Sequence, residues 1–322
     1  MHARRPHRTV FSITAVALVT AVGGCGGGSS DKPDAKGQTA EAKKVLAQTF
    51  GPNSKARSGQ FAATINVAVK GVKRYRQPVI LETSGPYSYS SGNDLVDEDQ
   101  TLSLTVHDLE NGAGMTISGD EAFVNLGSTA YPIPSGIVAT MRSNARGVRN
   151  PIIRATAPFG IRIDRWVAKA TVVGHQSVAG VDTIHVTGDV KPERIFVDAS
   201  RFTHLLKSLQ VTRIVDLPDA IGPGVRAALA RSVKTAHGDI YTGAADHALR
   251  KAQMTMTLEP SGADRRRLGG IRSATIKATL DVTEVGQPQD IKVQSDRGKY
   301  SELLQLFDAA SFSNRSPGQR GK

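Results

Sequence analysis

The chain has 322 residues, a formal net charge of +12, 39% hydrophobic residues and one cysteine. The hydrophobic content is enough for a packed core, which excludes a wholly disordered chain. A single cysteine excludes an intramolecular disulfide, so stability has to come from burial of apolar side chains. Aromatic residues make up only 5% of the chain and no basic stretch alternates with them, which argues against a nucleic-acid partner.

The first 25 residues have the pattern of an export signal that ends at the cysteine. Three arginines in residues 4–8 precede an apolar stretch, residues 10–22. That stretch is shorter than the roughly 20 residues that a membrane-spanning helix needs. Two small glycines then lead to Cys25, and a run of glycines and serines follows it. The arrangement resembles the lipobox of bacterial lipoproteins.

The lipobox resemblance implies that residues 1–24 are a signal peptide and that the thiol of Cys25 is acylated, with palmitate among the acyl chains. The alternative is an ordinary signal peptide followed by an incidental cysteine. The position of the only thiol, directly before a flexible tether, favours acylation. Two or three acyl chains anchor a protein stably, whereas one chain binds only marginally. We therefore expect a lipid-anchored protein on the extracytoplasmic face of the cell membrane.

Removal of residues 1–24 takes away three arginines and no acids, so the net charge falls from +12 to +9. A basic protein at this location is attracted to anionic lipid headgroups. Export also separates the chain from nucleic acid. The densest basic run, Arg265 to Arg267, lies among glycines and is predicted to be a solvated loop.

The pattern after the anchor predicts one helix and then many strands. Residues 26–38 lack periodicity and form a flexible tether after Cys25. Apolar residues recur at helical spacing over residues 40–50, and Gly51–Pro52 ends that helix. From Phe61 to Lys70, apolar and polar residues alternate, as in a strand with one buried face. Similar patterns predict strands at residues 79–83, 102–106, 115–118, 122–126, 171–173, 183–187, 238–242, 254–258 and 276–282.

Helical patterns interrupt and close this series of strands. They cover residues 195–209, 225–233 and 301–309. Residues 142–154 are basic, lack a clear period and receive no assignment. Short turns between the strands favour antiparallel hairpins, and nothing alternates as in a parallel, cofactor-binding sheet. The order predicts an α+β fold with a single domain, residues 39–310, followed by a polar, disordered tail, residues 311–322.

Three stretches carry a resemblance at the level of strand ends and turns. They are Ser58 to Ile65, Val173 to Thr183 and Leu280 to Pro288. Together with the lipobox, they resemble the LolA-type superfamily, and within it the mycobacterial LprG and LppX type lipoproteins, over nearly the whole mature chain. The resemblance implies a curved, unclosed antiparallel half-barrel with helices covering its concave face. Some members of the family hold acyl chains in a hydrophobic cavity between sheet and helices.

The alternation of the strands predicts which side chains would line such a cavity. The candidates are Ile65, Val67, Val69, Leu102, Leu104, Val106, Ile184, Val186, Met254, Met256, Leu258, Ile276, Ala278, Leu280 and Val282. Methionine is flexible and polarizable, which suits contact with disordered acyl chains. Ala278 is the small member of its strand and would leave room there. The same residues would also fill an ordinary packed core, since a cavity and a core have the same polarity pattern.

Motifs for catalysis are absent from the sequence. The chain has no Gly-x-Ser-x-Gly elbow, no phosphate-binding Gly-x-x-x-x-Gly-Lys-Ser/Thr loop and no His-Glu-x-x-His pair. Its histidines are isolated, without metal-ligand spacing. We therefore predict no enzyme, no metal and no cofactor. His185 is expected to be exposed on a strand, and Trp166 to be a structural anchor or else a contact for a lipid headgroup.

The sequence thus predicts a membrane-anchored extracytoplasmic lipoprotein that binds the acyl chains of a lipid, glycolipid or lipoprotein for transport or presentation. Its partners would be the acylated ligand and the membrane, through Cys25. The alternative is a non-carrier envelope lipoprotein with a packed core, which would act as a protein- or envelope-interaction module with an envelope protein as partner. The two hypotheses differ in whether the concave face is open or filled.

Overall fold

The computed structural model describes residues 35–52, 56–73, 76–89, 95, 97–106, 109–210 and 221–313. Within these ranges, the side chains of residues 35–39, 97–112 and 309–313 are not described. The signal peptide, Cys25 and most of the predicted tether lie outside the described residues. The described residues belong to one compact unit.

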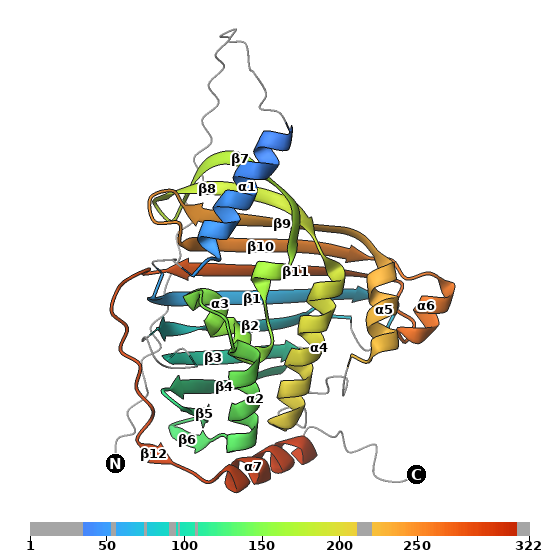
Figure 1. The fold of residues 1–322 in the computed structure, drawn as a ribbon. Helices are drawn as coiled ribbons and strands as arrows, with labels where there is room; N and C mark the ends of the chain where they lie inside the picture. Colours follow the sequence, from blue (N-terminus) through green and yellow to red (C-terminus); the bar gives the residue numbers. More distant parts are fainter. Residues whose placement is uncertain are drawn as a thin grey trace, which may run out of the picture. The chain divides into compact units, whose positions relative to one another are not determined.

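Twelve strands of the described chain form one sheet (Figure 1). The strands are β1 (Ser58–Lys70), β2 (Val79–Ser88), β3 (Asp97–Val106), β4 (Leu109–Ser118), β5 (Glu121–Leu126), β6 (Thr129–Pro132), β7 (Val167–Val178), β8 (Val181–Val190), β9 (Val233–Gly243), β10 (Leu249–Leu258), β11 (Ser273–Thr283) and β12 (Asp296–Arg297). Their spatial order is β12-β6-β5-β4-β3-β2-β1-β11-β10-β9-β8-β7. All pairs are antiparallel except β12 with β6, which is parallel.

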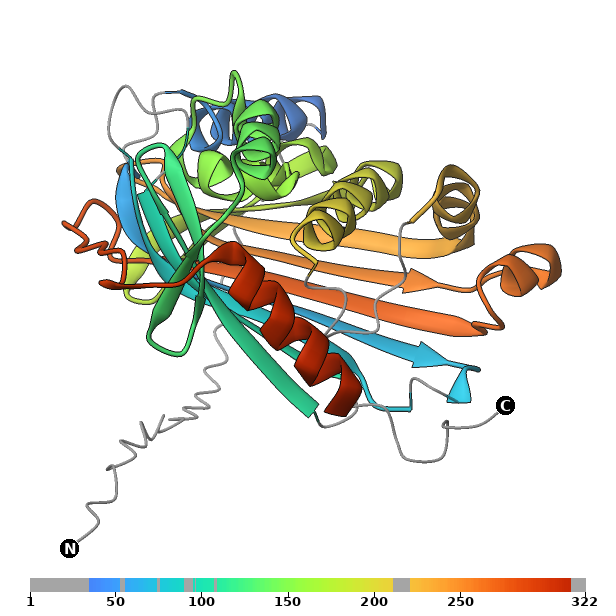
Figure 2. The same ribbon diagram turned by 90° about the horizontal axis from the view of Figure 1, so that it is seen from below.

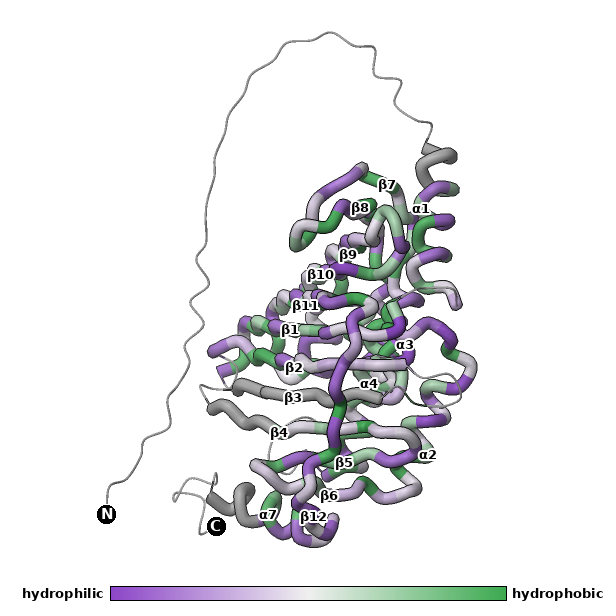
Figure 3. The backbone as a smooth tube through the Cα atoms, turned by 90° about the vertical axis from the view of Figure 1, so that its left-hand side faces the viewer, coloured by the Kyte–Doolittle hydropathy of each residue, from purple (hydrophilic) through white to green (hydrophobic). Residues whose placement is uncertain are grey.

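The sheet consists of two meanders that meet at one seam. Strands β1 to β6 form the first meander and β7 to β11 the second, and the pairing of β1 with β11 joins them. The order ends at β12 and β7, which are not paired with each other, so the sheet does not close into a barrel. Along β1 and β9 to β11, hydrophobic and hydrophilic residues alternate (Figure 3), so each strand has one apolar face.

Helices cover the concave face of this curved sheet (Figure 2). The helices are α1 (Ala35–Thr49), α2 (Ser135–Ala145), α3 (Pro151–Thr156), α4 (Pro192–Ser208), α5 (Pro223–Ser232), α6 (Gly262–Arg267) and α7 (Tyr300–Ser313), with two 3-10 turns, η2 (Ala157–Phe159) and η3 (Ile163–Arg165). Helix α1 packs on β7 and α7 beside β6, while α5 and α6 lie together at one end of the strands (Figure 1). The predicted fold, an α+β half-barrel with covered concave face, is confirmed.

Local sequence explains most of the helix boundaries. Helix α4 begins with Pro192 at its first turn, where a missing N–H costs nothing, and has Lys207 in its last turn, where it complements the helix dipole. The predicted helix over residues 225–233 ends one residue earlier, at Ser232, because Val233 already belongs to β9. The arginines 265–267, predicted as a loop, belong to the short helix α6 and are exposed.

The residues left without assignment, 142–154, contain the end of α2 and most of α3. Asn150 caps α3, because its side-chain oxygen accepts a hydrogen bond from the N–H of Ile153 at 3.2 Å. Pro151 at the first turn completes this start signal. The absence of a helical period follows from the break between two short helices.

The described side chains form two hydrophobic clusters. The larger cluster joins the first meander, α1, α2, α3 and α7, and includes Leu280 and Val282. The smaller one, which we call the closed end, consists of Val190, Ile195, Phe196, Met254, Met256, Leu258 and Ala274. Neither cluster contains a residue before Ala42, so a chain that begins at residue 26 retains all of both clusters.

Candidate ligand-binding cavity

The floor of a cavity is formed by two neighbouring rows of side chains that cross five strands. Strand pairing aligns the first row as Ile240, Ala252, Leu280, Ala63 and Thr83. It aligns the second row as Gly238, Met254, Ala278, Ile65 and Leu81. All of these residues line the cavity, and four of them are Gly or Ala. These small side chains therefore leave space between the sheet and the helices, where larger side chains would fill it.

Gly238 illustrates how a small residue keeps this space. A Cβ at position 238 would lie 2.9 Å from Cγ2 of Val190, closer than side-chain carbons normally approach. Val190 itself lines the cavity from the end of β8. A larger residue at position 238 would thus displace a cavity wall, so the glycine serves both strand packing and the open space.

The roof of the cavity comes from segments far apart in the sequence. They are the end of α1, helix α3 with the η2–η3 connection, and helix α4. Their main contributions are Phe50, Ile152, Phe159, Ile163, Phe202 and Leu206. Because the floor and the roof are both apolar, the cavity offers van der Waals contact in nearly every direction.

The size of the cavity matches a chain-like apolar ligand. The cavity has a volume of about 190 Å³. One water needs at least about 10–15 Å³ of such volume, so the cavity has room for several methylene groups in a row. With its open side included, the empty space is about 1470 Å³.

Charged groups are nearly excluded from the described lining. Asp239 is the single charged residue among the lining residues. Its carboxylate is already bound, because its Oδ1 accepts from Thr187 at 2.9 Å and lies 2.8 Å from Nε2 of His185. The strand alternation places both partners on the face of the sheet that the helices do not cover. The cavity therefore carries no free charge to bind a polar ligand.

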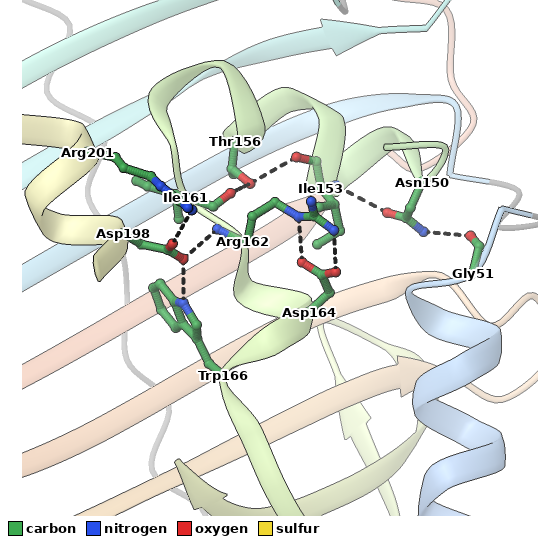
Figure 4. Close-up of polar contacts among 10 residues, drawn as sticks. All are labelled: Gly51, Asn150, Ile153, Thr156, Ile161, Arg162, Asp164, Trp166, Asp198 and Arg201. Carbon is green, nitrogen blue, oxygen red and sulfur yellow. Dashed lines mark hydrogen bonds and ion pairs between the residues drawn. The ribbon is translucent and has the colours of Figure 1, made fainter. Parts of the chain in front are cut away.

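A buried carboxylate holds the roof in place (Figure 4). Asp198 of α4 is 4% exposed and accepts three hydrogen bonds. Its donors are the backbone N–H of Arg162 at 2.9 Å, the indole N–H of Trp166 at 2.8 Å and the guanidinium of Arg201 at 3.3 Å. Two of these bonds join α4 to Arg162 and Trp166, the residues on either side of η3, and Trp166 lines the cavity. The expectation of a structural anchor at Trp166 fits this contact.

A second polar contact fixes the other side of the roof (Figure 4). The amide of Asn150 donates to the carbonyl oxygens of Thr49 at 2.9 Å and Gly51 at 3.0 Å, at the end of α1. The same side chain caps α3. One asparagine thus attaches the end of α1 to the start of α3, and both elements contribute side chains to the cavity.

The structure places four of the predicted candidates in the cavity lining. These are Ile65, Met254, Ala278 and Leu280. Ala278 lies between Ile65 and Met254 in one row of the floor and lines the cavity.

Other candidates lie on the same face but away from the cavity. Met256 and Leu258 are buried in the closed end, with Val69 and Ile276 packed against it. Val186 and Val282 are buried in the larger cluster, Ile184 packs against that cluster, and Val67 is half-buried next to Ile276. The side chains of Leu102, Leu104 and Val106 are outside the described ones, although backbone pairing sets Leu102 against Thr83 and Leu104 against Leu81.

The sequence reasoning missed the roof. Phe159, Ile161 and Ile163 lie in or beside short 3-10 turns, which have no period that a sequence pattern can reveal. Phe202 and Leu206 belong to a helix that was predicted, and its strong apolar face was the available signal. His185 is less exposed than expected, because its ring stacks on Tyr241 with centroids 4.4 Å apart and binds Asp239.

Comparisons with known proteins bear on the fold. No family model and no curated protein matches the chain. The structure is similar to LprF from Mycobacterium bovis, at 11% identity over 79% of this chain and 97% of that chain, with a TM-score of 0.39. It is also similar to the Mycobacterium tuberculosis lipoprotein LppX, at 13% identity over 80% of this chain and 99% of that chain, with a TM-score of 0.35. A third similar structure is a LolA superfamily protein from Nitrosomonas europaea, at 11% identity over 79% of this chain and 97% of that chain, with a TM-score of 0.25. The ligand class is inferred below from this chain's own cavity.

Two further findings concern the described residues alone. None of their helices has both the length and the apolar character to cross a membrane. They also contain no group of three or more His, Cys, Asp or Glu side chains arranged to hold a metal ion.

Proposed function

We propose that this chain is a membrane-anchored extracytoplasmic lipoprotein that holds an acyl chain of a lipid, glycolipid or lipoprotein in the cavity, for transport or presentation. The observation that carries the proposal is an apolar cavity of acyl-chain size in the middle of an otherwise packed concave face. A hydrocarbon chain has no hydrogen-bonding groups, so apolar walls are all that it requires. A charged headgroup would be costly to bury there and would stay at the open side.

Native mass spectrometry of the chain that begins at residue 26 tests the ligand. We expect masses above that of the protein by one lipid, lost on mild activation, and lipid recovered by organic extraction of the same sample. Protein that carries no lipid after purification, and that takes up no added fluorescent fatty acid, would overturn the proposal.

The proposed anchor is tested separately at Cys25. Cys25→Ser should leave unprocessed precursor or release soluble protein, and it should abolish incorporation of labelled palmitate. The reason is that a thioether to the acyl donor needs the thiol, and Cys25 is the one cysteine of the chain. Unchanged processing and membrane retention in the variant would contradict acylation at this position.

The second candidate function is a non-carrier envelope lipoprotein that binds a protein partner. Exposed apolar side chains favour it, namely Val173 on the edge strand β7, at 60% exposure, and Leu306 on α7, at 45%. Such a module needs no ligand in the cavity. Lipid-free protein in the native spectra, together with loss of an envelope partner in Val173→Asp, would favour this candidate over the carrier.

A further inference from the structure

Positive charge is concentrated at the end of the strands where α5 and α6 lie. The described residues of segments 70–73 and 76, 226–234 and 259–272 include ten Lys and Arg but two Asp and Glu, a net charge of +8. The whole chain after residue 24 carries +9. The rest of the mature chain is therefore nearly neutral, and the asymmetry belongs to one surface, which we call the basic end.

Contacts between the three segments show that the basic end is one continuous surface. Lys70 of β1 pairs with Ser273 of β11, and the N–H of Arg272 donates to the Lys70 carbonyl at 2.8 Å. The N–H of Glu259 donates to the carbonyl of Ser232, at the end of α5, at 2.7 Å. The views in Figures 1 and 2 both place α5 and α6 side by side beyond the strands.

A groove in this surface is surrounded by cations. Arg231, Lys234, Arg265 and Arg272 line it, from α5, β9, α6 and the residue before β11. The groove has a volume of about 500 Å³. Hydroxyl groups of two serines line it as well, and Glu259 is the only acid in the described lining. Guanidinium, ammonium and hydroxyl groups are the donors that phosphate oxygens accept from.

Most of the cations at the basic end lack a compensating acid. Among the described residues, Lys70, Lys234, Arg266 and Arg272 make no ion pair. Elsewhere on the protein the pattern differs: Arg142 pairs with Asp120, Arg250 with Asp246 and Lys251 with Asp281. Like charges held close together repel one another, so a surface of this kind is explained by an anionic partner.

The basic end is separate from the lipid cavity. The closed end lies between them, with Met256 and Leu258 buried. Arg272, which directly precedes β11, is six positions from Ala278 in the cavity floor, or about 20 Å along an extended strand. A ligand in the cavity therefore does not account for the cations.

We propose that the basic end docks on the surface of a bilayer rich in anionic phospholipids, with headgroup phosphates in the groove between Arg231, Lys234, Arg265 and Arg272. Clusters of Lys and Arg bind such surfaces through screened attraction that sums over the cations. The tether after residue 25 keeps the domain near a membrane if the chain is anchored as proposed. Docking itself requires neither the anchor nor a lipid in the cavity.

Vesicle binding by the chain that begins at residue 26 tests this proposal. Co-sedimentation with vesicles of phosphatidylcholine and phosphatidylglycerol is compared with vesicles of phosphatidylcholine alone, at low and at high salt. We expect binding to the anionic vesicles at low salt, little binding to the neutral ones, and release at high salt.

Two triple variants of equal charge separate a local site from net charge. Lys234→Gln, Arg266→Gln and Arg272→Gln together remove three exposed cations of the basic end. Lys43→Gln, Lys44→Gln and Arg149→Gln remove three exposed cations from α1 and from the turn before α3. The first triple variant should bind anionic vesicles about 100-fold more weakly, and the second should bind within a few-fold of the original chain. Unchanged far-ultraviolet circular dichroism confirms that both fold.

Four outcomes would overturn the proposal. They are equal binding to neutral vesicles, equal losses in the two triple variants, full competition by millimolar inorganic phosphate at constant ionic strength, and retention on an anionic polysaccharide without vesicle binding. Native mass spectrometry of the first triple variant should still report the same lipid as the original chain. A failure of membrane docking is thus distinguishable from a failure of the carrier proposal.

Discussion

Met254 and Met256 lie two residues apart on the same face of β10, yet their surroundings differ. Met254 lies at the border of the closed end and also lines the cavity, between Gly238 of β9 and Ala278 of β11. Met256 is fully buried in the closed end, between Ala236 and Ile276. Met254 thus has two small cross-strand neighbours, Gly and Ala. Two residues further along the strand, Met256 has a large neighbour, Ile276, and no empty space beside it.

The roof changes over the same distance. Ile195 and Phe196, near the start of α4, belong to the closed end, and Leu229 of α5 packs against it. Over the cavity, the η2–η3 connection and the later turns of α4 span the space instead. The comparison teaches that the cavity is a local feature: small side chains below and a roof held by polar contacts above.

The largest expected difference between the two regions is in truncation of the methionines. Met256→Ala should lower the free energy of unfolding by about 2–5 kcal/mol, because it leaves a hole in a filled core. Met254→Ala should cost less, about 1–2 kcal/mol, because its side chain already borders empty space and fewer contacts are lost. Denaturant unfolding measures the difference in the free energy of unfolding between the two variants, provided that both show the same dependence of that free energy on denaturant concentration. Equal costs would mean that the cavity is closed in solution.

The reverse substitution places a large side chain in each region. Ala274 lies in the closed end and Ala278 in the cavity floor, on the same face of β11. Ala274→Phe should cost about 1–3 kcal/mol through overpacking. Ala278→Phe should keep the melting midpoint within a few degrees, but reduce uptake of a fluorescent fatty acid and the amount of co-purified lipid.

The combination of readouts makes this pair decisive. If Ala278→Phe lowers the melting midpoint as much as Ala274→Phe, and neither variant loses lipid, then the middle of the sheet behaves as a packed core. Lipid loss in Ala274→Phe alone would instead place the ligand at the closed end.

Much of the fold follows from the sequence, because alternation along a strand is a local property. Phe61 to Val69 alternates without a break and corresponds to β1, and the strand from Ile276 to Val282 corresponds to β11. The short final β12 and the helix α6 were not predicted, since two and six residues carry too little pattern.

The position of the cavity along the strands could be predicted only in part. Ala278 indicated room, because a small residue within an apolar stripe leaves space in any packing. Ile276 and Ala278 have the same polarity and face, and what separates their environments is cross-strand register and the roof. Both depend on contacts between residues far apart in sequence. The roof residue Ile161, next to a 3-10 turn, has no sequence signal of its own.

The polar contact under the roof gives a somewhat smaller expected effect. Asp198→Asn retains one acceptor oxygen but presents an N–H₂ group to donors, so it should cost about 1–3 kcal/mol. Helix α4 should then exchange its backbone amides faster, and lipid should leave the cavity faster. Glu193→Gln, an exposed change on the same helix, is the matched control and should alter neither. Unchanged exchange in Asp198→Asn would show that the roof does not depend on this carboxylate.

The smallest expected effect concerns pH and the pair between Arg231 and Asp264, which joins α5 to α6 beside the closed end. The guanidinium of Arg231 donates to both carboxylate oxygens, at 2.6 and 3.2 Å. This hydrogen bonding lowers the pKa of Asp264 from its ordinary value of 3.8. A lowered folded-state pKa stabilises the fold above pH 3.8, and the contribution is lost as the pH falls through the lower, folded-state value.

Asp264→Asn should therefore lower the melting midpoint slightly at pH 7, because Arg231 is half exposed and solvent screens the pair. The difference from the original chain should shrink as the pH falls below 3.8, and melting curves between pH 2.5 and 7 measure it. The substitution also removes one of the two described acids of the basic end, so binding to anionic vesicles should become tighter while stability falls. If Asp264→Asn instead loses both stability and vesicle binding, then the Arg231–Asp264 pair shapes the groove. The reason is that the substitution adds positive charge, so binding can weaken only if α6 is displaced.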